Sequence, residues 1–518
     1  MTLRFTLIHL PLAALLGALN VLAFAPFGAW PVQILTLALL MWRLLRINSL
    51  NAVKQAALLG WAFGFGWTVC GVYWLYISLH VYGGMPGWIA ALAVVLLALF
   101  IGLYAALATG LTVWLRRRWS VSALMTALAI FPALWGLTEW TRGWIFTGFP
   151  WLVSGYAHTA SPLAGYAPVI GVYGVGMIAA LISGCLACLP QKKIPVLAAI
   201  GLLLVGYGLH TVNWTQPSGQ PISVRLLQGN VAQQMKFEPT QIDHTLALYK
   251  DMIRTKPADL IATPEIAIPV LQTQLPPEYL PAIADFAQQS GSTIALGIPI
   301  TDGPDNYANS VLGFYPQTAK AATSGSDPAP LYRYDKHHLV PFGEFIPYGF
   351  HWFVNLMNIP LGDFHRGNVV QPPFAVKDQW VLPNICYEDL FGEEIAAQLS
   401  APEASGHRAA TILLNMSNIA WFGDSIALPQ HLQISQMRTI ETGRPMLRAT
   451  NTGTTAVIDT HGNLRAHLPP LQFGTLAATV QGYNGDTPYI VMGNRLLLVC
   501  AALLLAAAWF TGRQRRNP

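Results

Sequence analysis

The sequence predicts an α-helical membrane bundle of about eight transmembrane helices joined to an α/β sandwich domain. The 518 residues are 53% hydrophobic and only 10% charged, whereas an ordinary soluble protein carries about 25% charged residues. The charges are unevenly spread, since 1–215 and 489–511 hold few of them and 222–485 has a normal density. Within 222–485, short apolar strands alternate with amphipathic helices. One soluble-type domain is therefore expected inside a membrane protein.

The apolar stretches predict the membrane spans, because a helix needs roughly 20 apolar residues to cross the hydrocarbon core. The first stretch continues past Phe24 and is followed by more spans, which indicates a membrane helix and not a cleaved signal peptide. The expected spans are 7–25, 30–46, 56–79, 88–115, 121–140, 162–189, 194–213 and 489–511. We therefore expect a transmembrane domain at 1–215 with seven helices, a polar domain at 222–485 and a C-terminal transmembrane helix at 489–511.

Lys and Arg residues in the short loops predict the orientation of the chain. One set of loops holds Arg4, Arg43, Arg46, Lys54, Arg116, Arg117, Arg118, Lys192, Lys193, Arg513, Arg515 and Arg516. The alternate loops hold almost none, with Arg142 as the exception. The first set is expected in the cytoplasm, which places 222–485 on the outer side of the membrane.

Two classes of function are disfavoured by the placement of charge. The net charge of +5 comes from basic residues at the ends of apolar runs and not from a basic patch, so nucleic-acid binding is not expected. A transport path would place charged residues within the spans, and only Glu139 qualifies.

The loop at 141–161 is rich in Trp, Phe, Gly and Pro and falls on the outer side. It has two interpretations. It is an aromatic belt at the membrane interface, or it is a lid or lipid-facing entrance to an active site that includes Trp151.

The pattern of 222–485 predicts individual elements. Strands are expected at 224–230, 260–263, 293–297, 311–315, 380–385, 411–415, 446–449 and 455–458, and helices at 240–255, 278–290 and 427–443. In sheets of this kind, reactive residues tend to lie at the strand ends.

Cys386 is the only cysteine of the polar domain, because the other four lie in predicted spans. The Cys185 and Cys188 pair has CxxC spacing, but its apolar helix favours packing over redox or metal chemistry. An unpaired thiol is a liability in an oxidising compartment. Cys386 directly follows the strand at 380–385, so it is either a presented nucleophile or a buried structural residue.

A nucleophilic thiol needs a base or a nearby positive charge, because its ordinary pKa is about 8.5. Glu265 follows the apolar run 260–264, and desolvation is expected to raise its pKa toward the range of a general base. The segment 332–344 offers Lys336, which could stabilise a thiolate or an oxyanion. His337 and His338 in the same segment compete for the role of base, and spacing alone leaves this choice open.

Three short motifs resemble the signature segments of the nitrilase superfamily: TPE at 263–265, YDKH at 334–337 and NICYE at 384–388. Longer runs resemble the apolipoprotein N-acyltransferase family. These are LYRYDKHHLVPFGEFIPY, NICYEDLFGEE, LLNMSNIAWFGDSIALPQHLQISQMRTIETGRPMLRATNTGTTAVID and the outer-loop motif GFPWL. The resemblance covers essentially the whole chain, including its membrane helices.

The resemblance implies an αββα sandwich and a role for each matching residue. Cys386 would be the nucleophile, Glu265 the general base and Lys336 the oxyanion stabiliser. Glu344, Tyr387 and Glu388 match positions that support the active site. The chain has Phe237 where the family often has Trp, which keeps ring contacts with an acyl chain but loses the indole N–H. Trp151 and Phe237 are candidate lipid contacts.

The implied reaction moves a fatty acyl chain from a membrane phospholipid, through a thioester on Cys386, to the N-terminal amine of S-diacylglyceryl-cysteine on an apolipoprotein. The resemblance also implies a multi-pass protein of the bacterial inner membrane with its catalytic domain on the periplasmic side. We expect a monomer, no metal and no cofactor. A membrane-tethered amidase would use the same triad but leave the helices without a role. A non-enzymatic scaffold would be expected to have lost Glu265, Lys336 or Cys386.

Overall fold

The computed structural model describes residues 5–189, 193–234, 236, 238–303, 306–316, 331–350, 363–401 and 408–516. The chain divides into two compact units. Unit 1 contains Met1–Tyr76, Pro86–Val212 and Val491–Pro518, and unit 2 contains Ile77–Met85 and Asn213–Ile490. Phe237 lies outside the described residues.

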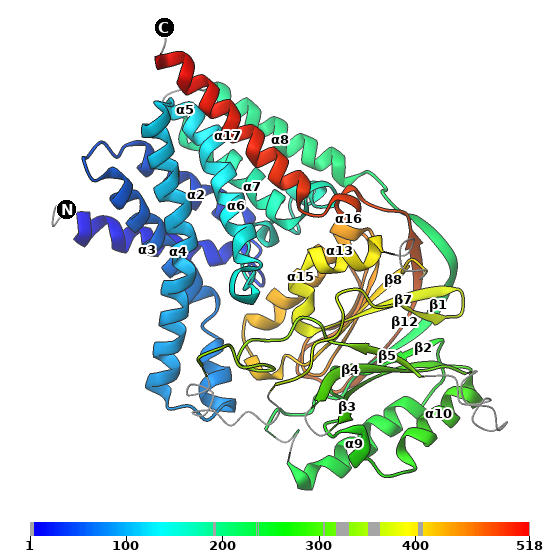
Figure 1. Cartoon of the computed structure of the whole chain (residues 1–518). Helices are drawn as coiled ribbons and strands as arrows, with labels where there is room; N and C mark the ends of the chain where they lie inside the picture. Colours follow the sequence, from blue (N-terminus) through cyan, green and yellow to red (C-terminus); the bar gives the residue numbers. More distant parts are fainter. Residues whose placement is uncertain are drawn as a thin grey trace. The chain divides into compact units, whose positions relative to one another are not determined.

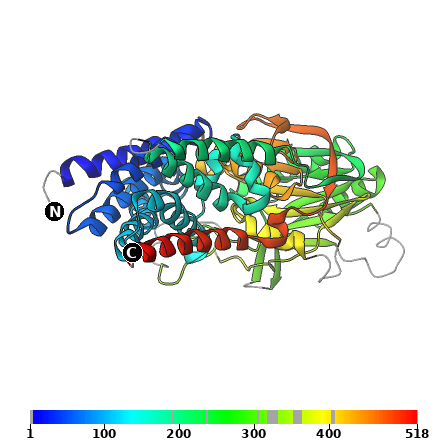
Figure 2. The same ribbon diagram turned by 90° about the horizontal axis from the view of Figure 1, so that it is seen from above.

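Unit 1 is a bundle of helices, which run beside one another in both views (Figure 1, Figure 2). They are α1 (Leu10–Asn20), α2 (Trp30–Leu45), α3 (Ala52–Gly71), α4 (Gly87–Trp119), α5 (Ala123–Met125), α6 (Phe131–Arg142), α7 (Ala167–Ala187), α8 (Ile194–His210) and α17 (Arg495–Arg516). Small residues allow close packing: a Cβ on Gly17 of α1 would lie 1.9 Å from the carbonyl oxygen of Phe63 on α3.

Within the described part of unit 1, four helical segments are long and apolar enough to cross a membrane: Gly87–Trp119, Ala123–Arg142, Pro162–Ala187 and Arg495–Arg515. The apolar helices Leu7–Ala23, Trp30–Leu45 and Ile194–His210 are shorter. The unit therefore has the character of a membrane domain, and the expected number of eight crossings stays a prediction.

Two expected spans are wrong at one end. The span at 56–79 stops early, because α3 ends at Gly71 and Val72 leaves the helix with φ −126°. A separate π-helical turn, η3 (Ile77–Tyr82), follows and belongs to unit 2. The span at 489–511 is interrupted, because Gly493 has φ +53° and separates α16 (Pro488–Met492) from α17.

Unit 2 contains two six-stranded sheets. The first has the order β12-β1-β2-β3-β4-β5, with strands Gly474–Asn484, Gln216–Gln228, Leu260–Ala262, Thr293–Gly303, Asn306–Phe314 and Tyr332–Asp335. The second has the order β11-β10-β9-β8-β7-β6, with strands Leu464–Leu468, Thr455–Ile458, Met446–Thr450, Ile412–Ser417, Gln379–Ile385 and Phe374–Val376. Their inner faces share one apolar core, in which Leu226 and Val311 of the first sheet join Leu414 and Leu447 of the second.

Helices cover the outer faces of both sheets, as Figure 1 shows. α9 (Pro239–Arg254) and α10 (Tyr279–Ser290) pack on the first sheet, and α13 (Gly392–Ser400) and α15 (Ala427–Thr442) pack on the second. The four layers confirm the αββα sandwich that the sequence predicts.

Four strands end where the site begins. Glu265 follows β2, and Lys336 follows β5 directly. Cys386 follows β7 and Asn418 follows β8, both without an intervening residue. The strand pairing within the two sheets therefore fixes the backbone positions of these four residues.

Candidate active site

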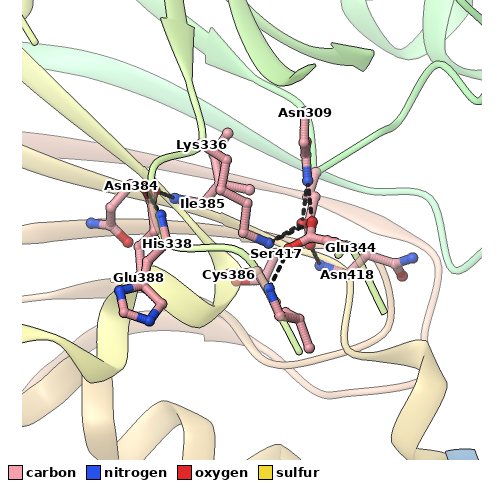
Figure 3. Close-up of polar contacts among 12 residues, drawn as sticks. Asn309, Lys336, His338, Glu344, Asn384, Ile385, Cys386, Glu388, Ser417 and Asn418 are labelled. Carbon is pink, nitrogen blue, oxygen red and sulfur yellow. Dashed lines mark hydrogen bonds and ion pairs between the residues drawn. The ribbon is translucent and has the colours of Figure 1, made fainter. Parts of the chain in front are cut away.

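A single ammonium group joins two carboxylates at the centre of the site. Lys336 Nζ lies 3.0 Å from Glu265 Oε1 and 2.8 Å from Glu344 Oε1. All three side chains are buried, and Lys336 is only 1% exposed. Buried charges of this kind are tolerated only when they are paired and hydrogen-bonded. The structure thus brings together three of the residues that the sequence analysis named, and Figure 3 labels two of them, Lys336 and Glu344.

The two carboxylates receive further hydrogen bonds that fix their orientation. Asn309 Nδ2 donates to Glu265 Oε1 at 2.8 Å and to Glu344 Oε1 at 2.9 Å. The backbone N–H of Asn418 donates to Glu265 Oε2 at 2.8 Å, and that of Val340 donates to Glu344 Oε2 at 2.8 Å. Both oxygens of each carboxylate are therefore held by donors from separate parts of the fold.

Cys386 begins the 3₁₀ turn η9 (Cys386–Leu390) with φ +51°. A non-glycine residue adopts this left-handed conformation only when its surroundings hold it there. Its thiol interacts electrostatically with Glu265 and Lys336. The nucleophile candidate therefore belongs to the same cluster as the proposed base and the lysine.

The carboxylate of Glu388 fixes the turn after β7. It accepts hydrogen bonds from the N–H of Ile385 at 2.6 Å, the N–H of His337 at 2.7 Å and the hydroxyl of Tyr334 at 3.0 Å. Glu388 thus links the Cys386 turn to the segment that carries Lys336, which explains its place in the family motif without a role at the reacting atoms.

The two histidines make contacts that lead away from the Lys336–Glu265 pair. His337 Nδ1 bonds to the carbonyl of Gly367 at 2.7 Å. His338 Nδ1 lies 2.8 Å from Glu394 Oε1, and its ring stacks on Phe391. Tyr387 lies beside the same rings. These positions favour Glu265 over either histidine as the base.

The expected rise in the pKa of Glu265 is wrong. Burial raises the pKa, as expected, but Lys336, the nearby Lys236 and the Asn309 hydrogen bond outweigh it, and the pKa is lowered below its ordinary value. Burial and then Glu265 hold the pKa of Cys386 well above that of a free thiol, although Lys336 acts against them. In the resting site the proton therefore lies on Cys386, and Glu265 is a carboxylate ready to accept it.

Lys236 is a second buried lysine that the sequence analysis did not select. Its Nζ donates to the backbone carbonyl of Glu265 at 3.2 Å. Burial lowers its pKa to about 8, although Glu265 and Cys386 act in the opposite direction. Lys336 therefore contacts both Glu265 and Glu344, and Lys236 lies beside Glu265, so two cations match the two carboxylates while Cys386 is protonated.

Other site residues could have been found by looking for polar residues that end an apolar run or lie within one. Asn418 follows the apolar strand β8, and Asn309 lies inside the buried strand β4. Lys236 precedes Phe237 directly in the sequence, and only the aromatic residue of this segment was predicted to have a role. No three His, Cys, Asp or Glu side chains gather as a candidate metal site in the ranges that the structure describes.

Trp151 lies in unit 1, where its ring packs against Trp74 with 4.8 Å between the centroids. It is buried, whereas Trp144 and Phe146 of the same loop are exposed. A role of Trp151 in lipid contact stays a prediction. The exposed rings of Trp144 and Phe146 are a second candidate position for lipid contact.

The fold and this Cys–Glu–Lys cluster define a carbon–nitrogen hydrolase domain, and the Carbon-nitrogen hydrolase family model matches residues 223–489. The model of the apolipoprotein N-acyltransferase N-terminal domain matches residues 16–185. The chain belongs to the apolipoprotein N-acyltransferase family, and its apolar helices mark it as a membrane protein.

Two apolipoprotein N-acyltransferases support this assignment over nearly the full length. The chain is 51% identical over 509 residues to the apolipoprotein N-acyltransferase of Ralstonia nicotianae, covering 98% of this chain and 94% of the relative. It is 43% identical to that of Nitrosomonas europaea, covering 96% and 97%. A solved nitrilase-superfamily amidase from Nesterenkonia is 19% identical with a TM-score of 0.38, covering 54% of this chain and 97% of the amidase.

Proposed function

We propose that this chain transfers a fatty acyl chain from a membrane phospholipid to the N-terminal amine of an S-diacylglyceryl-cysteine on an apolipoprotein, with a thioester on Cys386 as the intermediate. The observation that carries the proposal is the convergence of the half-buried Cys386 with the buried Glu265 and Lys336 in one cluster. A thiol, a carboxylate that can take its proton and a cation that can face an oxyanion are the parts that acyl transfer requires.

In the first half-reaction, Glu265 takes the proton of Cys386 as Sγ attacks the ester carbonyl of the phospholipid. The new C–S bond leaves a negative charge on the carbonyl oxygen, which Lys336 stabilises. The tetrahedral intermediate collapses by breaking the ester C–O bond. Glu265 returns the proton to the departing oxygen, so a lysophospholipid alcohol leaves and the acyl chain stays on Cys386.

In the second half-reaction, the α-amine of the diacylglyceryl-cysteine attacks the thioester carbonyl. Glu265 accepts a proton from the attacking nitrogen, and the C–S bond breaks. Cys386 recovers a proton, and the acceptor carries the acyl chain as an amide. A thioester suits transfer to an amine only if water is kept from the site, so the buried cluster matches the chemistry.

The proposal includes a membrane setting. Residues 1–215 and 489–511 would supply eight crossings of the bacterial inner membrane, and 222–485 would form a catalytic domain on the periplasmic side. The distribution of Lys and Arg among the short loops supports this orientation. A reporter fused after 516 should be active only in its cytoplasmic form, and a reporter placed at 222 only in its external form.

The proposal is tested by the intact mass of the purified full-length protein after incubation with phospholipid vesicles and no acceptor. The wild type should gain one acyl chain that neutral hydroxylamine removes, and a diacylglyceryl-cysteine peptide should clear it. Cys500→Ser, which changes a cysteine of α17, should behave like the wild type, whereas Cys386→Ser should form no hydroxylamine-labile adduct. A wild type without an adduct, but with Cys386 reactive to a thiol reagent, would favour a tethered amidase.

A further inference from the structure

The backbone carbonyl of Cys386 contacts a helix that packs on the outer face of the second sheet. His431 of α15 lies with Nε2 3.2 Å from the carbonyl oxygen of Cys386. His431 is buried, at 1% exposed, and comes from 45 residues further along the chain. The hydrogen bond therefore connects Cys386, the strained first residue of η9, to α15. The position of this helix is not set by the strand pairing of β7.

Arg448 of β9 decides which ring nitrogen of His431 carries the proton. Its guanidinium lies 2.5 Å from His431 Nδ1. A guanidinium can only donate, so Nδ1 must accept and Nε2 must carry the hydrogen. Burial lowers the pKa of Arg448 only to about 10, so it keeps its charge at neutral pH. The neutral imidazole is thereby fixed as a donor to the Cys386 carbonyl.

Arg448 is itself held in place by groups around it. Its guanidinium donates to Ser435 Oγ at 2.5 Å and to the carbonyl of Thr454 at 3.2 Å. Asp389 of η9 lies 3.7 Å from it and accepts a hydrogen bond from Ser435. Because Arg448, Ser435 and Asp389 are fully buried, the chain of contacts runs from β9 through α15 and returns to the turn that carries Cys386.

The peptide between Cys386 and Tyr387 is trans, since the described cis bond is that between Ala25 and Pro26. In a trans peptide the N–H points opposite to the C=O of the same unit. A donor that fixes the Cys386 carbonyl therefore also fixes the direction of the Tyr387 N–H. The N–H that follows a nucleophile on a strand-to-helix turn commonly serves as an oxyanion donor.

We propose that His431, locked by Arg448, is a positioning residue for acyl transfer: it orients the Cys386–Tyr387 peptide so that the Tyr387 N–H faces the developing oxyanion beside Lys336. The proposal rests on the function proposed above. It predicts an effect on steps that form a tetrahedral oxyanion and none on reactions of the thiol that form no such species.

Two rates on the purified full-length protein separate these steps. Thioester formation from phospholipid vesicles passes through an oxyanion, whereas alkylation of Cys386 by iodoacetamide, read on the Cys386 peptide by mass spectrometry, does not. His431→Leu should slow thioester formation at least about tenfold, as loss of an oxyanion donor does, while alkylation stays at the wild-type rate. His431→Gln keeps an amide N–H near the Nε2 position and should restore most of the lost rate.

A matched control lies on the same helix. Gln436 of α15 donates to the carbonyl of Gly462 at 2.7 Å, so Gln436→Leu removes one hydrogen bond of α15 remote from Cys386 and should leave both rates unchanged. Wild-type thioester formation by His431→Leu, or an equal loss of both rates, overturns the positioning role. If His431→Leu does not fold, His431→Asn, which is too short to reach the carbonyl, must be slower than His431→Gln for the role to stand. A wild type that forms no thioester contradicts the proposed function instead.

Discussion

Glu344 Oε1 accepts a 2.8 Å hydrogen bond from Lys336 Nζ, the same ammonium group that serves Glu265. Lys336 thus makes direct ion pairs with two buried carboxylates, and its own pKa is raised because Glu265 and Glu344 together outweigh its burial. Glu344 is therefore expected to hold the charged lysine in place as well as to contribute to the charge balance of the site. Stability and catalysis should respond differently when this balance is changed.

Lys336→Met should lower the free energy of unfolding by about 3–5 kcal/mol, because it leaves Glu265 and Glu344 buried without their cation. Adding Glu344→Gln removes one of the two uncompensated charges and should recover part of the loss. Neither variant should form the thioester, because the oxyanion has lost its cation. Thermal unfolding in detergent and intact mass check the two parts, and a double variant no more stable than Lys336→Met would contradict the shared-charge account.

Glu388→Gln should destabilise the turn that carries Cys386. The carboxylate accepts from Ile385 and Tyr334 through Oε2 and from His337 through Oε1. The glutamine side chain ends in one acceptor oxygen and one donor NH₂ group. The NH₂ group would face donors that now bind a carboxylate oxygen, which should lower the free energy of unfolding by about 1–3 kcal/mol. Thioester formation should slow as well.

The matched control for this change is Tyr334→Phe, which removes one hydroxyl donor but keeps the backbone N–H contacts of Glu388. It should lower the melting temperature less than Glu388→Gln and leave most of the thioester formation. Equal effects of the two variants would show that the hydroxyl contact alone stabilises the turn.

Gly297→Ala should disturb catalysis from the neighbouring strand. A Cβ on Gly297 of β3 would lie 2.2 Å from the carbonyl oxygen of Pro264 and 3.0 Å from the nitrogen of Ile266, on either side of Glu265. The Glu265 backbone must therefore move, and a displacement of about 1 Å can cost on the order of 100-fold in rate. Gly303→Ala, at the end of the same strand, meets no atom within 4 Å and should keep the wild-type rate of thioester formation.

The sequence predicted the strands that are buried on both faces. The runs at 260–263, 380–385 and 411–415 correspond to β2, β7 and β8, which lie inside their sheets. The edge strands β5, β6, β11 and β12 were missed. β11 has only exposed and half-buried positions, and in β12 a few buried positions are separated by exposed and half-buried ones. Such strands form because a neighbouring strand supplies hydrogen bonds and not because their own pattern is apolar.

Cys386, Glu265 and Lys336 could be selected from the sequence because each stands in a distinctive local motif, and the structure brings the three together. The contacts of Lys236, Asn309 and His431 could not be predicted, since they arise across the fold: His431 meets Cys386 across 45 residues, and Asn309 meets Glu265 across 44. The pKa of Glu265 could not be predicted for the same reason. Desolvation follows from its apolar neighbours in the sequence, whereas the opposing charges of Lys336 and Lys236 come from distant segments.

The pKa of Lys236, lowered to about 8 mainly by burial, predicts opposite effects of pH on activity and stability. As pH rises through about 8, the site loses one of its two cations, so thioester formation should fall. Between about 8 and the ordinary value of 10.5 the native state binds fewer protons than the unfolded state at this residue, so its contribution to the free energy of unfolding should rise with pH. Rates of thioester formation and melting temperatures measured from neutral pH upward check both slopes. Lys236→Gln should flatten both slopes, whereas Lys256→Gln, which changes an exposed lysine, should keep them. If the loss of activity at high pH persists unchanged in Lys236→Gln, another group causes it.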